Sequence, residues 1–196
     1  MNTIVLETTE QGDVGVDVYQ RLSNDRVLFI SGEINDKVAT DISATLLLKN
    51  NENRKDKITL FINSPGGHLR NVFMIFDMMK IIKAPVETIC IGAAMDAAAI
   101  LLSAGKKGMR LATKNSFISV GQLEHNWSSQ FSMTDVQKIM QITEKDNKSM
   151  MEVFAKTTGK PLSTILNDFD RRVFMNAVRA QKYGFIDKVV SFGKGK

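Results

Sequence analysis

The run Ile62-Asn63-Ser64-Pro65-Gly66-Gly67 has the composition of a turn that could hold an anion or a carbonyl oxygen. It lies between an alternating apolar stretch at residues 58–61 and an apolar segment at 68–83 that is long enough for a helix. A glycine pair between a strand and a helix presents backbone N–H groups to a closely approaching ligand. Gly66 and Gly67 are therefore predicted oxyanion-hole donors. The alternative is a tight turn that needs glycine only for its shape.

Further motifs follow the glycine turn in a fixed order along the chain. They are Ile89-Cys90-Ile91-Gly92-Ala93-Ala94, Leu101-Leu102-Ser103-Ala104-Gly105-Lys106-Lys107-Gly108, Phe174-Met175-Asn176-Ala177 and Tyr183-Gly184-Phe185-Ile186-Asp187. In their order and spacing, these motifs resemble the ClpP family, the proteolytic subunits of Clp proteases. The resemblance covers residues 17–190, which is nearly the whole chain.

The resemblance places the three catalytic positions of the family on residues that cannot form a serine-protease triad. The family's nucleophilic serine precedes the glycine of an Ala-Gly pair by nine residues, and this position is Asp96. The family's histidine follows the asparagine of an Asn-Ser pair by six residues, which gives Gly121. Its aspartate lies two residues before a Phe-Met pair, which gives Arg172. Glycine offers no general base and arginine cannot orient one, so the sequence predicts a degenerate triad.

Asp96 and Arg172 carry opposite charges on either side of the vacated histidine position at Gly121. Arginine is long, and its fork of donors suits a carboxylate. We therefore predict that Arg172 pairs with Asp96, directly or through one water. In the alternative, Asp96 caps the helix that follows it, where the helix dipole favours a carboxylate, and Arg172 faces solvent. A role for Asp96 in other chemistry would need a partner, for which Glu124 is the candidate.

The other reactive side chains form no recognisable site. His68 and His125 are the only histidines, and neither has an acidic residue at ligand spacing, so we expect no metal and no other cofactor. Cys90 is the only cysteine; it cannot form an internal disulfide and suits a reducing compartment. Three serines lie too far along the motifs to replace the nucleophile: Ser103, Ser116 and Ser119.

Composition narrows the class of protein. The chain has 196 residues, 43% of them apolar, which fits one domain with a sizeable core. No apolar stretch is long enough to span a bilayer, and the mixed, acidic start at residues 1–14 is unlike a signal or transit peptide. The net charge of +5 comes from scattered basic residues without interleaved aromatics. We expect a cytoplasmic protein, or one of an organelle stroma or matrix, with neither a membrane nor a nucleic-acid partner.

Strand and helix patterns alternate along the chain, which predicts an α/β fold with a largely parallel sheet. The expected helices are 15–22, 36–48, 68–82 and 96–103, and the expected strands are 26–31, 58–63, 86–92 and 187–192, with two short strands within 109–120. The run Ser132-Met133-Thr134-Asp135 fits a capping box that begins a long helix ending at Lys156. Gly159 and Pro161 mark the end of that helix and the start of the next.

By resemblance, the fold is of the ClpP–crotonase type, built from ββα units with a handle segment. The handle, residues 123–156, packs two heptameric rings together in the family. Here residues 123–131 lack the family's glycine-rich composition, which predicts an altered ring-to-ring contact. Residues 1–196 are expected to form a single domain with a flexible N-terminal segment, 1–16, and a basic tail, 191–196.

The resemblance predicts a non-catalytic, ClpR-like subunit of an ATP-dependent Clp protease complex. It would form heptameric rings with active ClpP subunits, which cleave unfolded polypeptide, and would help to dock an AAA+ unfoldase. The residues expected at the docking surface are Leu60, Phe61, Phe73 and Phe76. Two alternatives stay open. One is a crotonase-like enzyme that uses the Gly66-Gly67 hole for an enolate or another oxyanion, and the other is a scaffold or inhibitor that assembles with active ClpP.

Overall fold

The computed structural model describes residues 4–9, 12–123 and 132–190. At its centre is a seven-stranded sheet of order β3-β4-β5-β6-β9, with β7 paired to both β5 and β8. Its strands are β3 (Val27–Ser31), β4 (Ile58–Ser64), β5 (Val86–Met95), β6 (Arg110–Thr113), β7 (Phe117–Val120), β8 (Val173–Asn176) and β9 (Lys188–Val190). All of its pairings are parallel except that between β7 and β8. The prediction of an α/β fold with a largely parallel sheet is confirmed.

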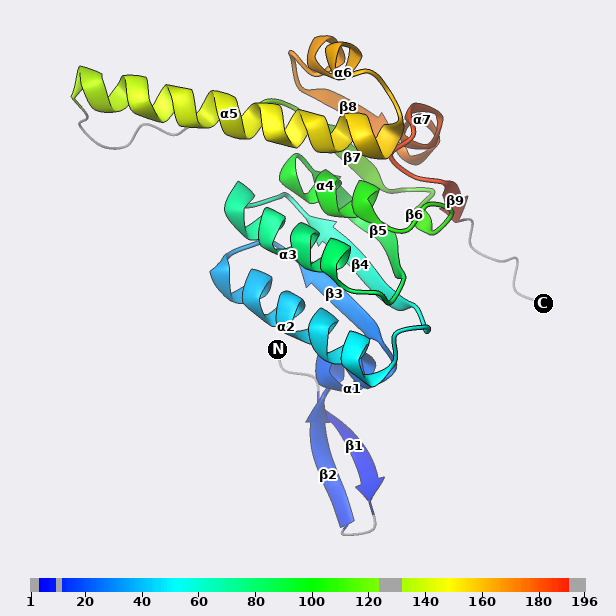
Figure 1. Ribbon diagram of the computed structural model, residues 1–196. Coiled ribbons are helices and arrows are strands. Elements are labelled where there is room, and N and C mark those ends of the chain that lie inside the picture. Colours follow the sequence, from blue (N-terminus) through cyan, green and yellow to red (C-terminus); the bar gives the residue numbers. More distant parts are fainter. Residues whose placement is uncertain (1–3, 10–11, 124–131, 191–196) are drawn as a thin grey trace.

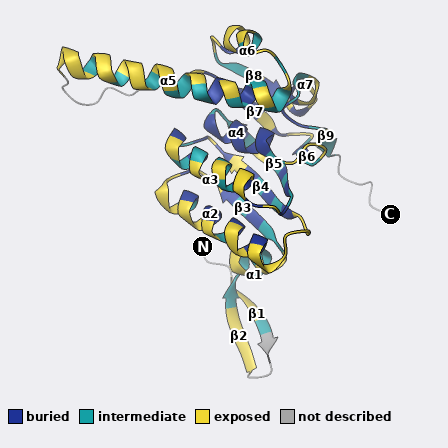
Figure 2. Ribbon diagram, in the orientation of Figure 1, coloured by how far each residue is buried: buried dark blue, intermediate teal, exposed yellow. Residues whose placement is uncertain are grey.

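Three helices connect successive parallel strands and lie side by side over one face of the sheet (Figure 1). They are α2 (Asp36–Glu52), α3 (Leu69–Ile81) and α4 (Ala97–Ala104). The buried residues of α2 recur at helical spacing, as at Ala39, Ile42 and Leu46, so this helix turns one apolar stripe to the core. Every residue of α4 is buried, and α4 lies between α3 and α5 (Figure 2).

The strands alternate between the two faces of the sheet, as a pleated strand must. In β4, Ile58, Leu60 and Ile62 are fully buried, whereas Thr59 and Phe61 are only partly buried. The Phe61 ring stacks on Phe29 of β3 with the ring centroids 4.9 Å apart. One face of the sheet therefore forms the core under the helices, and the other keeps half-exposed side chains.

The long helix α5 (Met133–Thr158) packs on α4 through its C-terminal half. Its buried residues all lie in that half: Met150, Met151 and Phe154. The N-terminal half projects from the body of the molecule (Figure 1). The remainder of the expected handle, residues 124–131, lies outside the described residues, as does the tail at 191–196.

Both ends of α5 follow the predicted signals. The Ser132 hydroxyl accepts a hydrogen bond from the backbone N–H of Asp135 at 3.1 Å, so the capping residue is the expected one. Gly159 ends the helix in the left-handed region with φ 76°. Pro161 is the N-cap of the next helix, α6 (Leu162–Asp168).

The N-terminal region differs from the prediction. Two strands, β1 (Ile4–Thr9) and β2 (Gly12–Asp17), form an antiparallel hairpin, and α1 (Val18–Asn24) follows. The expected helix at 15–22 is therefore wrong in its first turn. Asp17 explains the difference because its carboxylate caps the backbone N–H groups of Tyr19 and Gln20, which makes Val18 the first helical residue.

Two C-terminal elements complete the fold. Strand β8 joins the sheet beside β7, and α7 (Ala177–Tyr183) follows it at once, with the Asn176 side chain as its cap. Neither element was predicted from the sequence. None of the helices in residues 4–9, 12–123 and 132–190 combines the length and apolarity needed to cross a bilayer.

Candidate functional site

Three strand ends bring the predicted triad positions together. Asp96 follows β5, Gly121 follows β7, and Arg172 precedes β8. Strand β7 lies between the other two, parallel to β5 and antiparallel to β8. Because of these directions, the end of β5, the end of β7 and the start of β8 meet at one edge of the sheet.

Asp96 has a strained backbone, with φ 48° and ψ −113°. Among the described residues, only Asp96 and Arg26 are non-glycine residues with positive φ. A sharp, strained turn from a strand into a helix is the geometry of a nucleophile elbow, and such backbone strain costs about 1–3 kcal/mol. The turn is held by the Asp96 N–H, which donates to the Ser119 carbonyl at 2.8 Å.

The Asp96 side chain forms an ion pair with Arg172. Nη1 of Arg172 lies 2.8 Å from Oδ2 of Asp96, and the two side chains are 30% and 22% exposed. The predicted pairing of these residues is confirmed. Asp96 does occupy the N-cap position of α4, but its side chain makes no capping hydrogen bond, so the helix-cap alternative is wrong.

Arg172 also takes up the room beside Gly121. A Cβ atom built on Gly121 would lie 3.1 Å from Cβ and 3.3 Å from Cγ of Arg172. A histidine at this position would therefore have to displace the arginine stem. Gln122 follows Gly121 in the chain. Its Nε2 donates to the backbone carbonyl and to Oδ1 of Asp170, both at 3.1 Å. These bonds brace the segment after β7 against the segment before β8.

The glycine turn packs directly against the Asp96 elbow. A Cβ atom on Gly66 would lie 3.1 Å from the carbonyl oxygen of Met95 and 3.6 Å from the nitrogen of Ala97. Gly66 also has φ 104°, a conformation that favours glycine. Close approach and backbone conformation both require glycine here. The shape of the turn is therefore enough to explain why Gly66 is a glycine, without any role in binding an oxyanion.

The Gly66 N–H is not free. It donates to the Ser64 hydroxyl at 3.1 Å, while the Gly66 carbonyl accepts from the N–H of Ile34 at 2.9 Å. This corrects the expectation that both glycines present unused donors. Gly67 is so close to Ile34 that a Cβ atom built on Gly67 would clash with the backbone of Ile34. The sequence analysis missed the part played by Ser64, although it belongs to the same motif.

Among the described residues, His68 directly follows the glycine turn, and Cys90 lies within β5. His68 is exposed and is the N-cap residue of α3, without a side-chain capping bond. His125 and Glu124 lie outside the described residues. Burial raises the pKa of the Cys90 thiol to about 11, although a hydrogen bond with Ser116 opposes the shift. This thiol is therefore protonated and unreactive at neutral pH.

The expected docking residues fall into three environments. Leu60 is fully buried, so no partner can touch it, and its assignment to a docking surface is corrected. Phe61 lies on the half-exposed face of the sheet. Phe73 and Phe76 lie on α3, which covers the opposite face, and their rings meet edge to face with centroids 6.2 Å apart.

A strained elbow, a glycine turn packed against it and two neighbouring strand ends have the layout of a hydrolase site on an α/β sheet. A family model described as Clp protease matches residues 10–192. The chain therefore belongs to the Clp protease family. Membership gives it a role related to Clp proteolysis and implies oligomeric assembly with ClpP-like subunits.

Proposed function

We propose that this chain is a non-catalytic, ClpR-like subunit of an ATP-dependent Clp protease. The observation that carries the proposal is the ion pair between Asp96 and Arg172, at the edge where the family's triad would stand. In this arrangement Asp96 offers no hydroxyl or thiol at the elbow, and its carboxylate is bound to a cation. Gly121 and Arg172 supply no general base.

The serines nearest the elbow do not offer a replacement nucleophile. Ser119 and Ser64 are both buried, at 0% and 1% exposure. Ser64 is committed to the glycine turn, and the Ser119 hydroxyl lies 3.5 Å from the Asp96 carboxylate, at the limit of a hydrogen bond. Neither hydroxyl forms a hydrogen bond to a histidine among the described residues, in which His68 is the single histidine.

Exposed apolar side chains support assembly with other subunits. Phe117 and Phe174 stack on the β7–β8 pair with centroids 5.4 Å apart, and both are about half exposed. The projecting half of α5 also exposes apolar side chains, namely Met133, Met140 and Ile142. Exposed apolar side chains that form a contiguous patch mark interaction sites. We propose that they contact neighbouring subunits in rings that include active ClpP.

The same geometry bears on docking of an AAA+ unfoldase. Helix α3, which carries Phe73 and Phe76, covers the face of the sheet opposite to Phe61, so we propose that one subunit does not present all three rings together. Two adjacent subunits could, if the half-exposed sheet face of one met the α3 side of the next. Docking would then be a property of the ring and would not require a working triad in this subunit.

The test compares the purified chain, an active ClpP and their mixture. A fluorophosphonate probe should label the active ClpP and leave this chain unlabelled, and the chain alone should cleave neither fluorogenic peptides nor casein. Native mass spectrometry of the mixture should show particles that contain both chains. Labelling of any serine in this chain would overturn the proposal.

The two alternatives give different results in the same experiment. An inhibitor or scaffold would enter mixed particles and abolish their unfoldase-driven proteolysis, whereas the proposed subunit leaves such particles active. A crotonase-like enzyme would form no particle with active ClpP and would turn over an acyl thioester. The engagement of the Gly66 N–H by Ser64 speaks against this last alternative.

A further inference from the structure

A cavity lies at the far end of α4 from Asp96. Its volume is about 770 Å³, within the range of small-molecule sites. The C-terminal ends of α3, α4 and α5 form much of its wall, and the rest comes from the starts of β5 and β6, from α7 and from the segment that leads into β9. Nothing in the predicted protease-related role uses this cavity.

The cavity is strongly positive. Its basic residues are Lys80, Lys106, Lys107, Arg110 and Lys156, and its single acidic residue is Asp187. That carboxylate is already bound by Arg110, through Nε at 2.9 Å and Nη2 at 2.6 Å. The other four cations therefore face the cavity without a carboxylate partner among the described residues.

Two of the cations have a structural role, because they hydrogen-bond to helix ends. Lys80 donates to the carbonyl of Ala104 at 2.8 Å, and Arg110 donates to the carbonyl of Thr157 at 2.9 Å. These carbonyls lie in the last turns of α4 and α5, where backbone acceptors lack intrahelical partners. Lys80 and Arg110 therefore serve the helix ends and would be needed without any ligand.

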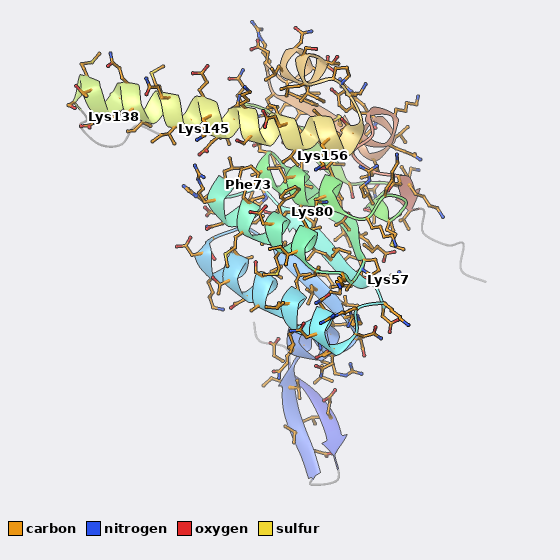
Figure 3. All side chains as sticks on the ribbon, in the orientation of Figure 1. Lys57, Phe73, Lys80, Lys138, Lys145 and Lys156 are labelled. Atoms are coloured by element: carbon orange, nitrogen blue, oxygen red, sulfur yellow. The ribbon has the colours of Figure 1, made fainter. Side chains whose placement is uncertain are left out.

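The other three lysines have no such structural role. Within the described ranges, the ammonium groups of Lys106, Lys107 and Lys156 make no hydrogen bond and no ion pair. Lys106 and Lys107 follow α4 directly, and Lys156 is in the last turn of α5. Figure 3 shows Lys156 on α5 above Lys80 on α3. Burial first, and then the Lys156 and Arg110 cations, lower the pKa of Lys80.

Part of the cavity wall is apolar. It includes Phe76, Met79, Pro85, Val86 and Ile186. We propose that the cavity binds a phosphorylated small molecule, with its phosphates on Lys106, Lys107 and Lys156 and its less polar body against this wall. A multiply charged phosphate would satisfy the three lysines together, and charge-assisted bonds of this kind are the strong ones. The inference is independent of whether the Asp96 edge is catalytic.

The test is calorimetric titration of the full chain at low salt with tripolyphosphate, ATP and adenosine. Tripolyphosphate and ATP should bind at one site and compete, and adenosine should not bind. If ATP binds clearly more tightly than tripolyphosphate, a nucleotide is the better ligand; equal affinity favours a free polyphosphate. Both results support a phosphate site. Absence of binding by both phosphates, or binding of adenosine as tight as that of ATP, would overturn the proposal.

Matched variants separate a built site from general positive charge. Lys106→Gln, Lys107→Gln and Lys156→Gln together should weaken tripolyphosphate binding by at least about tenfold. Lys138→Gln, Lys145→Gln and Lys148→Gln remove the same charge from the exposed part of α5 and should leave it unchanged. Equal loss in both triple variants would contradict the proposal. Lys107→Glu alone, in an exposed loop, provides a second variant with little risk to folding.

Discussion

Asp96 keeps a backbone conformation that its own side chain does not need. A positive φ at a residue with a Cβ costs free energy, and an aspartate that only paired with an arginine could do so from an unstrained turn. The strain persists because neighbouring bonds fix the turn, including that from the Asp96 N–H to the Ser119 carbonyl. The surrounding fold therefore determines the strained turn, and the Asp96 carboxylate is not its cause.

The first prediction concerns the ion pair at this elbow. A double-mutant cycle of Asp96→Asn and Arg172→Gln should give a coupling energy of about 1 kcal/mol in urea unfolding, because both side chains are mostly buried. The matched control is the exposed pair Lys37 and Asp41, whose coupling should be smaller, about 0.3–0.5 kcal/mol. Equal coupling in both cycles would mean that burial adds nothing at the Asp96 site.

The second prediction concerns restoration of a triad. Asp96→Ser alone should stay inactive toward peptides, because a serine without a base is a poor nucleophile. Gly121→His alone should destabilise the fold by about 1–3 kcal/mol, since its Cβ would press on the Arg172 stem. Adding Arg172→Asp should relieve part of that cost, and the triple variant should recover weak peptide cleavage. Turnover by Asp96→Ser alone would show that a base exists elsewhere.

The limits of sequence reasoning are visible at single residues. The Asp96–Arg172 pair was predictable because opposite charges flanked a position with no side chain. The burial of Leu60 could also be predicted, because Ile58, Leu60 and Ile62 alternate along the strand and share its buried face. The docking assignment came from the family resemblance alone and did not use this alternation, so it placed Leu60 on the wrong face of the sheet. The bond from Ser64 to the Gly66 N–H depends on the folded turn, and spacing alone contains no signal for it.

At the scale of elements, a buried ion pair ties β6 to the segment that leads into β9. Arg110 is 5% exposed and binds the Asp187 carboxylate through two nitrogens, while the backbone N–H groups of Gly108 and Arg110 donate to the same carboxylate. Burial opposes the charge on Asp187, but the hydrogen bonds from Arg110 and Gly108 outweigh it and lower the pKa of this carboxyl.

The third prediction follows from the direction of this pKa shift. A carboxyl with a lowered pKa in the folded state stabilises the fold above its unfolded pKa, about pH 4, and this contribution is lost as the pH falls through the folded pKa. Asp187→Asn should lower the free energy of unfolding by about 3 kcal/mol at neutral pH. It should also make stability less dependent on pH in acid. Asp77→Asn, an exposed change on α3, is the control and should leave the acid profile unchanged.

Most elements of the sheet and the helices over it followed from hydrophobic periodicity and turn residues. The strands at 58–64 and 86–95 and the helices after them lie close to their expected ranges. The hairpin β1–β2 was missed because its described side chains are largely exposed, so that no buried face stands out. Strand β8 was missed because its four residues acquire their role only by pairing with β7, far away in the sequence.

At the scale of the whole molecule, the chain has features that remain unpartnered in a single copy. The projecting half of α5, the half-exposed face of the sheet and the stacked Phe117 and Phe174 all expose apolar groups, in different directions. A dimer through one patch would leave the others in water. A closed ring uses a different patch on each side of the subunit, and two stacked rings add a third contact.

The last prediction is that assembly and unfoldase docking appear together. Analytical ultracentrifugation should show ring-sized particles, at least when an active ClpP is present, with active ClpP alone as the control. A cognate AAA+ unfoldase should bind those particles and not the dissociated chain, because Phe61 and Phe73 lie over opposite faces of one sheet and can adjoin only across two subunits. A strictly monomeric chain, with and without active ClpP, would contradict the assembly. Tight unfoldase binding by the monomer would instead show that one face of a single subunit is sufficient, and would place the docking surface away from this pair of residues.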